Sequence, residues 1–292
     1  MSKVAFVILH YLTTVDTIEC IESIQENVKY DNYEIVVIDN ASNNDSFETL
    51  RNKYEKISNI NLIKNKENLG FAKGNNVGYL YAKERLKAEF IFVINNDTLI
   101  KDENFVIDIV NYYKKNKFHV LGPNIISLQD DGRQNPLNTV LTTKKQVINE
   151  IIKYSILLSM NIIKLEDLKK YILKKVKKEK VQIDKADNKN NIMENVPLHG
   201  SCMIFSKDYI NMNEYAFYPE TFLYVEEDIL FYLCNKNNLK TVYFPKVTIY
   251  HKEDSSTDFL MNTASEKRRF LYKNILKSLN IYYKLIKRQE VK

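Results

Sequence analysis

Residues 34–44 read EIVVIDNASNN, an apolar run that ends in an acid and a short stretch of polar residues. Similar apolar runs occur at residues 4–9, 60–63 and 90–94. All of them are continuous rather than alternating, which is typical of strands buried on both faces of a parallel sheet. Segments with helical spacing of apolar residues separate the runs, around residues 18–25, 45–54 and 75–86. This order predicts an open α/β sheet with right-handed crossover connections.

Polar residues stand directly after three of the expected strands, at residues 10–14, 39–42 and 95–98. Because ligands of open α/β sheets bind beyond the carboxyl ends of the strands, we expect the functional site at this edge. No G-x-G-x-x-G follows the first strand, and the chain contains no G-x-x-x-x-G-K-[ST]. Both a dinucleotide-dependent dehydrogenase and a P-loop NTPase are therefore disfavoured.

The composition is that of a globular protein, since the 292 residues are 45% apolar and 27% charged. The sequence contains no apolar run of 18 residues or more, so no transmembrane helix is expected. The first apolar run is too short for a signal peptide and lacks a cleavage site. Three widely spaced cysteines fit neither a disulfide framework nor a zinc site. We expect a protein of the reducing cytoplasm.

Basic residues are concentrated in two segments. Residues 140–192 and residues 266–292 each carry a net charge of +7, so the rest of the chain must carry −8 to give the overall +6. Such asymmetry favours a neutral or acidic body with basic appendages that meet a polyanion or an anionic membrane. Solvated helix faces are the alternative. Residues 143–165 could equally pack on the body or on a second subunit, which leaves a homodimer open.

Several residues at the expected strand ends could carry chemistry. Asp39 could accept hydrogen bonds from a nucleotide base or ribose, although a turn or helix-cap role is the alternative. Gly70, Gly74 and Gly78 lie within nine residues of a chain that has six glycines. They would let the backbone approach a ligand, and a helix starting nearby would offer free N–H groups to a phosphate. Packing between a loop and a helix would explain these glycines as well.

Acidic residues supply the other candidates. Asp97 could hold Mg²⁺ or Mn²⁺, since these ions take one or two protein carboxylates together with substrate phosphates. The triplet Glu226, Glu227 and Asp228 suits either a helix N-terminus or a general base whose pKa is raised by like charges and burial. His251 follows an expected strand at residues 247–250 and could be a second metal ligand or a structural histidine.

The combined motifs resemble those of family 2 glycosyltransferases with the GT-A fold, and most closely those of rhamnosyltransferase-like enzymes of bacterial surface polysaccharide assembly. The segments occur in the family's order, as VAFVILHY, EIVVIDNASNN, NKENLGFAKGNNVG, FIFVINNDT, FLYVEED and then His251. The resemblance covers roughly residues 3–125 and 195–260. It implies a Rossmann-like, open, mixed but mostly parallel sheet with helices on both faces. A helical insertion and a basic C-terminal helix are expected in addition.

The resemblance also implies roles for individual residues. Asp39 corresponds to the aspartate that binds the nucleotide base. The expected nucleotide-sugar site comprises His10, Asp39, Asn68, Gly70, Phe71, Gly74, Asn75, Asn96 and Asp97. The metal motif D-x-D falls on residues 95–97, with Asn at its first position, so Asp97 is the main metal carboxylate and His251 a second ligand. Gly200 and Ser201 correspond to the acceptor pocket.

The acid pair of the family aligns with Glu226 and Glu227, which assigns Glu227 as the general base. Glutamate stands here where aspartate is usual, and Glu227–Asp228 reads as the same motif shifted by one residue. The catalytic candidates are therefore Glu226, Glu227 and Asp228.

The resulting expectation is an inverting glycosyltransferase of bacterial surface polysaccharide synthesis, which moves a hexosyl or rhamnosyl group from a TDP- or UDP-sugar. The acceptor would be a glycan or polyprenyl-linked hydroxyl, the cofactor Mg²⁺ or Mn²⁺, and the location the inner face of the cell membrane. No nucleic-acid partner is expected. A sugar nucleotidylyltransferase is disfavoured, because HYLTT after the first strand has neither glycine nor cations to hold a triphosphate. A catalytically silent glycan- or membrane-binding module is the alternative from another class.

Four segments are expected along the chain. The nucleotide-sugar-binding half would span residues 1–125 and the variable segment with the insertion residues 126–195. The acceptor-binding and catalytic half would follow at 196–264, and the basic amphipathic helix at 265–292.

Overall fold

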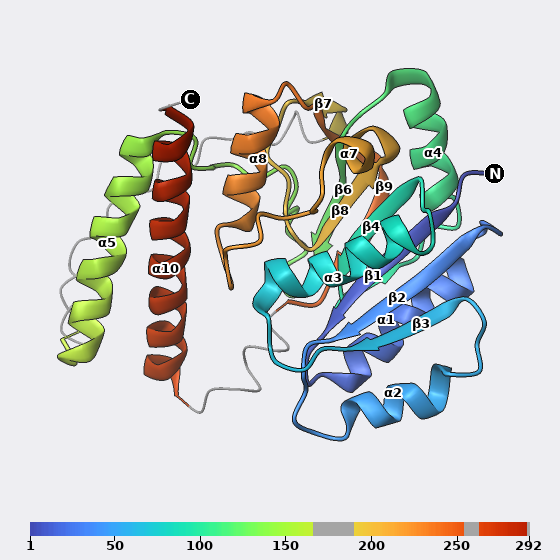
Figure 1. Ribbon diagram of the computed structural model, residues 1–292, viewed down its shortest axis with the longest axis horizontal. Coiled ribbons are helices and arrows are strands. Elements are labelled where there is room, and N and C mark those ends of the chain that lie inside the picture. Colours follow the sequence, from blue (N-terminus) through green and yellow to red (C-terminus); the bar gives the residue numbers. More distant parts are fainter. Residues whose placement is uncertain (166–189, 254–262, 291–292) are drawn as a thin grey trace.

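A nine-stranded sheet forms the centre of the protein, with helices on both of its faces (Figure 1). The computed structural model describes residues 1–165, 190–253 and 263–290. The strands are β1 (Val4–His10), β2 (Tyr33–Asp39), β3 (Ile60–Lys64), β4 (Phe90–Asn95), β5 (Thr98–Ile100), β6 (Val120–Ser127), β7 (Met193–Glu194), β8 (Cys202–Ser206) and β9 (Thr241–His251). The helices are α1 (Thr14–Asn27), α2 (Ser46–Tyr54), α3 (Gly70–Glu84), α4 (Phe105–Asn116), α5 (Lys144–Ile162), α7 (Lys207–Met212), α8 (Glu226–Lys236) and α10 (Ala264–Glu290).

The strand order is β3-β2-β1-β4-β8-β6-β9-β5, and β7 pairs with β9. The first four strands of this order are mutually parallel. Strand β8 is antiparallel to both of its neighbours, so β6 and the parallel β9 run in the same direction as β4. The expected fold class, an open α/β sheet that is mixed but mostly parallel, is confirmed.

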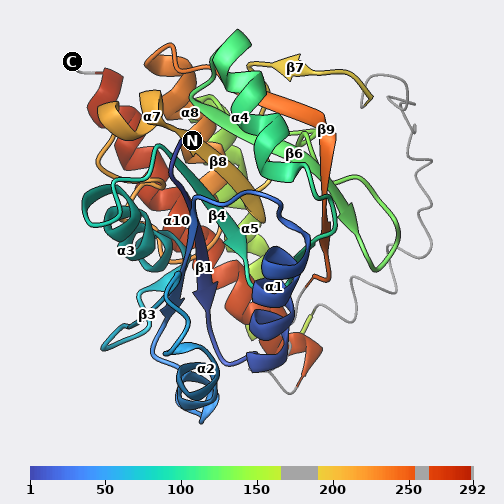
Figure 2. The same ribbon diagram turned by 90° about the vertical axis from the view of Figure 1, so that its right-hand side faces the viewer.

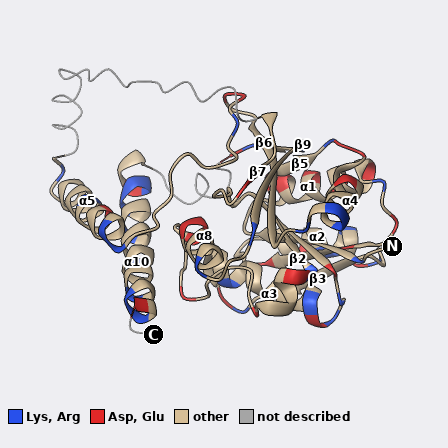
Figure 3. Ribbon diagram, turned by 90° about the horizontal axis from the view of Figure 1, so that it is seen from above, with Lys and Arg blue, Asp and Glu red and all other residues tan. Residues whose placement is uncertain are grey.

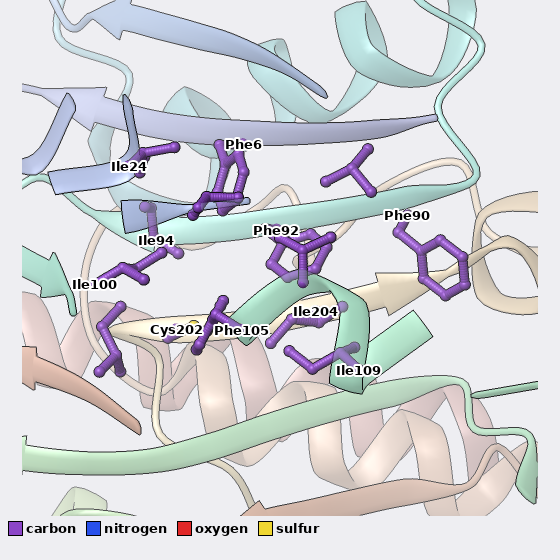
Figure 4. Packing of buried hydrophobic residues seen from close by; sticks show 14 of the residues in the cluster. Phe6, Ile24, Phe90, Phe92, Ile94, Ile100, Phe105, Ile109, Cys202 and Ile204 are labelled. Atoms are coloured by element: carbon purple, nitrogen blue, oxygen red, sulfur yellow. The ribbon is translucent and has the colours of Figure 1, made fainter. Parts of the chain in front are cut away.

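Alternate residues of the central strands face two separate cores, as period-two geometry requires. Phe6 and Phe92 face the core under α1, α2 and α4, whereas Val7 and Val93 face the core under α3, α7 and α8. Figure 2 shows α1 and α3 on opposite sides of the sheet. In the first core, the ring of Phe92 packs 6.1 Å from that of Phe105, between centroids (Figure 4). Burial on both faces explains why the strands are continuously apolar.

Helix α3 packs unusually close to the sheet. A Cβ atom at Gly74 would lie 2.6 Å from Leu9 Cδ1, and one at Gly78 would lie 2.4 Å from Val7 Cγ1. Both glycines therefore serve helix–sheet packing, which is one of the two roles considered for them, and contact of Gly74 with a ligand stays a prediction. The helix also begins at Gly70 rather than at residue 75.

Helices α5 and α10 form a pair on the far side of α8 from the sheet (Figure 3). A third core joins the three helices through Val147, Ile229, Leu279 and Tyr282. The tyrosine hydroxyl also donates to the Leu141 carbonyl at 2.7 Å. The insertion and the C-terminal helix thus both contact the body, while the lysine-rich residues 169–180 lie outside the described residues. No helix in the described part of the chain is long and apolar enough to cross a bilayer.

Candidate active site

The strand register gathers the predicted site residues at one edge of the sheet. His10, the last residue of β1, is level with Asp39, and its neighbour Leu9 is level with Asn95. On the other half of the sheet, His251 ends β9 and is level with Thr98, the residue after Asp97. This is the carboxyl edge at which open α/β sheets bind ligands.

Asp39 is fully buried at the end of β2. Both carboxylate oxygens lie 3.3 Å from the Ser42 backbone N–H, and Oδ1 lies 3.8 Å from His10 Nε2. The two ring nitrogens of His10 lie 2.7 Å from Thr17 Oγ1 and 2.9 Å from Ser46 Oγ. Burial lowers the pKa of His10 to about 4, against the opposing charge of Asp39, so the ring is neutral. His10, expected to bind the nucleotide sugar, is fully buried and has both ring nitrogens within hydrogen-bond distance of protein hydroxyls.

Asn40 holds the loop that leads into α3, a role that the sequence motifs did not indicate. Its Nδ2 donates to Asn68 Oδ1 at 2.9 Å and to the Gly70 carbonyl at 3.2 Å. Its Oδ1 accepts from Asn65 Nδ2 and from the Leu69 backbone N–H. Because this side chain follows Asp39 directly, one strand end carries the carboxylate and fixes the facing loop.

The first backbone N–H groups of α3 donate hydrogen bonds to other groups of the protein. Gly70 donates its N–H to Asn68 Oδ1 at 2.9 Å, and Phe71 donates its N–H to the Phe222 carbonyl at 2.6 Å. These two N–H groups are therefore not available to a phosphate, contrary to the expectation from the sequence. Gly70 has a φ of +77°, and a Cβ atom there would lie 2.1 Å from the Phe222 oxygen. The absence of a side chain at Gly70 therefore allows the loop that precedes the acid cluster to pack directly against the start of α3.

Two neighbouring asparagines in α3 differ in how fully their side chains are hydrogen-bonded. Asn76 forms two hydrogen bonds with the backbone of Phe217, through Nδ2 at 2.7 Å and Oδ1 at 3.0 Å. The neighbouring Asn75 donates to the Phe71 carbonyl, but its Oδ1 is buried with no hydrogen-bond partner among the described residues. An acceptor without a partner is costly to bury, so Asn75 Oδ1 is a candidate contact for a donor group of a ligand.

Asp97 and His251 face each other across the edge. Asp97 Oδ1 is buried, lies 3.3 Å from His251 Nε2 and has no hydrogen-bond partner among the described residues. His251 Nδ1 lies 2.8 Å from Gln134 Oε1. Because that amide oxygen can only accept, Nδ1 is the protonated nitrogen and the lone pair of a neutral ring lies at Nε2. Two acceptors thus lie 3.3 Å apart.

This pair fits a small divalent cation. Two ligands of one octahedral Mg²⁺ are themselves about 3 Å apart, and such ions are completed by substrate phosphates and water. The described residues contain no cluster of three or more His, Cys, Asp or Glu that could hold a metal. The remaining ligands would therefore come from substrate and solvent. Asn96, also expected to bind the donor, instead donates Nδ2 to Thr13 Oγ1 at 2.8 Å and Thr17 Oγ1 at 2.9 Å, which anchors the turn to α1.

Glu227 contacts the loop that lies beside Asp97 and His251. Its Oε1 accepts from the Gly200 N–H at 3.2 Å, and a Cβ atom at Gly200 would lie 2.6 Å from that oxygen. The preceding His199 accepts at Nδ1 from the Ser201 N–H, and its ring lies 5.8 Å from the ring of His251. Burial lowers the pKa of His199, an effect that the charge of Glu227 opposes. The expected acceptor residues Gly200 and Ser201 therefore lie in a loop that contacts Glu227 and, through His199, which the motifs did not indicate, His251.

The three acids at the start of α8 have different surroundings. Glu226 is almost completely buried, and burial together with the charge of Glu227 raises its pKa to about 8. Asp228 points away from Gly200 and accepts from the Leu141 N–H at 2.5 Å; burial raises its pKa to about 6. Of these three acids, Glu227 is the one with a hydrogen bond to the loop at residues 199–201 among the described residues, and it is half-buried.

The backbone before the acid cluster is strained. Tyr224 and Val225 have φ angles of +69° and +72°, in the left-handed region that β-branched residues in particular avoid. Such strain persists where surrounding contacts fix the backbone, and it clusters at functional sites. Here Ser278 of α10 donates to the Leu223 carbonyl at 2.8 Å. Helix α10 thus helps to fix the turn that positions Glu227.

Comparison with solved structures finds the same fold in S. aureus TarS. TarS 1-349 in complex with UDP aligns with a TM-score of 0.53 and 15% identity, over 88% of this chain and 62% of that chain. TarS 1-349 in complex with UDP-GlcNAc aligns with a TM-score of 0.54 and 14% identity, over 90% and 60%. The protein therefore spans less than two thirds of these structures.

A search of curated proteins found no match. In contrast, the sequence model described as glycosyl transferase family 2 matches residues 8–177, which is more than half of the chain. This region contains the end of β1, all of β2, β3 and β4, and both Asp39 and Asp97. The protein therefore belongs to glycosyl transferase family 2.

Proposed function

We propose that the protein transfers a sugar from a nucleotide-diphosphate donor to a hydroxyl of a glycan or lipid-linked acceptor, with inversion at the anomeric carbon. The observation that carries this proposal is the arrangement at the sheet edge. Glu227 contacts the loop at residues 199–201, which through His199 also contacts the Asp97–His251 pair. A base and a metal-ligand pair in one site suit a single displacement on a diphosphate-linked sugar.

The donor would occupy the edge between β2 and β4. Asp39 would accept hydrogen bonds from the nucleotide base, and Asn75 Oδ1 would accept one from the donor's hydroxyl groups. Asn68, Gly70 and Phe71 would line the same side through the loop that Asn40 holds. We favour UDP-sugars, because the similar TarS structures contain UDP and UDP-GlcNAc; TDP-sugars remain the second candidate.

Catalysis would rest on proton removal by Glu227. Its carboxylate takes the proton from the acceptor hydroxyl while that oxygen attacks the anomeric carbon from the face opposite the diphosphate. The bond from the sugar to the diphosphate breaks as the new glycosidic bond forms, so one step inverts the configuration. Mg²⁺ or Mn²⁺, held by Asp97 and His251, would supply charge stabilisation for the leaving diphosphate. Glu226, protonated at neutral pH, adds no second negative charge beside the base.

A thermal-shift screen tests the proposed donor class. We expect UDP or a UDP-sugar to raise the Tm in the presence of Mn²⁺ and much less in its absence. A ligand at 100 times its Kd stabilises the native state by about 2.7 kcal/mol, a readily measured shift. TDP-sugars serve as the alternative donors and ATP as the unrelated nucleotide. If no UDP- or TDP-sugar raises the Tm above the shift that ATP produces, the proposed function is wrong.

We further propose that the α5–α10 pair contacts an anionic membrane. Helix α5 exposes Ile148, Ile152 and Ile156 at four-residue spacing, which forms an apolar stripe. Helix α10 exposes one face of basic residues, formed by Lys273, Lys277, Lys284 and Lys287. Exposed apolar and basic residues together are typical of interfacial helices, and each cation near an anionic leaflet contributes about 1 kcal/mol. A second subunit on the α5 stripe is the alternative.

Flotation with vesicles separates these possibilities. Wild-type protein should float with phosphatidylglycerol-rich vesicles and less with phosphatidylcholine vesicles or at high salt. The double variant Ile152→Glu/Ile156→Glu should lose flotation, whereas the double variant Asn52→Glu/Asn111→Glu, which adds the same charge at exposed positions of α2 and α4, should keep most of it. Equal flotation of wild type and double variant would contradict membrane contact through α5. A second result would also contradict it: wild-type protein that is dimeric in light scattering while the Ile152→Glu/Ile156→Glu variant is monomeric. The stripe would then be a subunit interface.

A further inference from the structure

A groove of about 560 Å³ lies beside the acid cluster, between the loop before α5, α5 itself, the start of α8 and α10. This volume is within the range of about 300–1,000 Å³ that is typical of small-molecule sites. The polar and aromatic side chains along it include Asn149, Glu150, Lys153, Tyr154, Tyr224 and Asp228. Ile275 and Leu279 of α10 add apolar surface.

We propose that this groove binds the neutral sugar units of a glycan acceptor, next to the unit that carries the reacting hydroxyl. This inference rests on the proposed glycosyltransferase function and names its acceptor class. Carboxylate and amide side chains accept and donate hydrogen bonds to sugar hydroxyls, while tyrosine rings and the α10 side chains cover the apolar faces of the sugar rings. The groove combines both kinds of group.

The position of Asp228 connects the groove to the base. Successive residues of a helix point roughly 100° apart, and here Glu227 reaches Gly200 while Asp228 reaches Leu141 at the groove. The groove and the catalytic carboxylate thus lie on two sides of one helical turn. A glycan in the groove has its nearest sugar beside the turn that carries the base.

Charge selects a neutral rather than an anionic occupant. Glu150 and Asp228 line the groove together with a single cation, Lys153. Lys153 Nζ already lies 2.7 Å from Glu150 Oε2. A phosphate or uronic acid in the groove would face the Asp228 carboxylate with no free cation among the described lining residues. Hydroxyl groups carry no such penalty.

A bulky side chain in the groove tests the inference. Asn149 is exposed on the groove wall and its side chain makes no hydrogen bond among the described residues, so Asn149→Trp should fold and narrow the groove. Ser155→Trp, exposed on another side of the same helix, is the matched control. The probe is an array of neutral and acidic oligosaccharides of one to four sugars, applied with UDP and Mn²⁺. Circular dichroism melts of both variants check folding.

We expect wild type and Ser155→Trp to bind neutral oligosaccharides of two or more sugars, and Asn149→Trp to bind them at least tenfold more weakly. Equal binding by the two variants, a preference for acidic oligosaccharides, or no binding of any neutral oligosaccharide by wild type would overturn the inference. The UDP-dependent rise in Tm is measured on the same samples. If it persists while the groove result fails, only the acceptor site is wrong; if it is absent as well, the proposed function fails.

Discussion

Glu227→Gln is expected to lower kcat by about 10²–10⁴-fold, the usual contribution of general-base catalysis, with donor affinity unchanged. Glutamine has the same shape, and its Oε1 can still accept from the Gly200 N–H. What it loses is the capacity to take a proton from the acceptor hydroxyl. The measurement is release of UDP in the presence of acceptor, alongside titration calorimetry of donor binding. A reduced donor affinity would instead indicate a structural role for this side chain.

Asp228→Asn is the companion variant, because the acid motif can be aligned in two registers. The asparagine Oδ1 can keep the bond from the Leu141 N–H, and the side chain faces the groove rather than residues 199–201. We therefore expect kcat to stay within a few-fold of wild type, with the larger effect on acceptor KM. If Asp228→Asn is inactive while Glu227→Gln retains near-normal kcat, the base is Asp228 and the alignment is shifted by one residue.

The parallel half of the sheet could be predicted from the sequence, and the other half could only partly be predicted. Strands buried on both faces leave continuous apolar runs, such as residues 34–38. Strand β9 was expected only at residues 247–250, yet it begins at Thr241 and contains Pro245. The register on β6 jumps from Phe244 to Thr248, so the proline lies in an irregularity where its missing N–H costs no ladder bond. Local pattern alone does not reveal such an interruption within one strand.

The candidate site could likewise be predicted from the sequence only in part. Asp39, Asp97 and His251 could be placed because a strand end is visible in the sequence. The roles of His199 and Gln134 could not be predicted, because each depends on a residue more than 25 positions away. His199 interacts with Glu227, and Gln134 contacts His251. The sequence left both a packing role and a ligand-binding role open for the glycine-rich segment, for the same reason. Gly74 and Gly78 look like ligand-binding glycines until the side chains of β1 and β2 that press on α3 are known.

Asp97→Ala should abolish the Mn²⁺-dependent part of UDP binding while leaving the fold intact. Loss of a direct metal ligand should weaken Mn²⁺ binding by more than the roughly 10–100-fold caused by losing an outer-shell partner. The fold should persist because Asp97 Oδ1 has no hydrogen-bond partner among the described residues, so its removal leaves no donor unsatisfied. The bond from the Lys252 N–H goes to the Asp97 backbone oxygen, which alanine keeps.

Titration calorimetry of UDP with and without Mn²⁺ measures this effect. Asp45→Ala is the control, since Asp45 is an exposed carboxylate before α2 that makes no cap hydrogen bond with its side chain. Unchanged Mn²⁺-dependent affinity in Asp97→Ala would rule out the metal assignment. The metal-free titration makes the result specific, because Asp39 is expected to bind the base whether or not the cation is present. Residual binding in that titration, equal in wild type and Asp97→Ala, would therefore show that the donor site is intact and that only the cation has been lost.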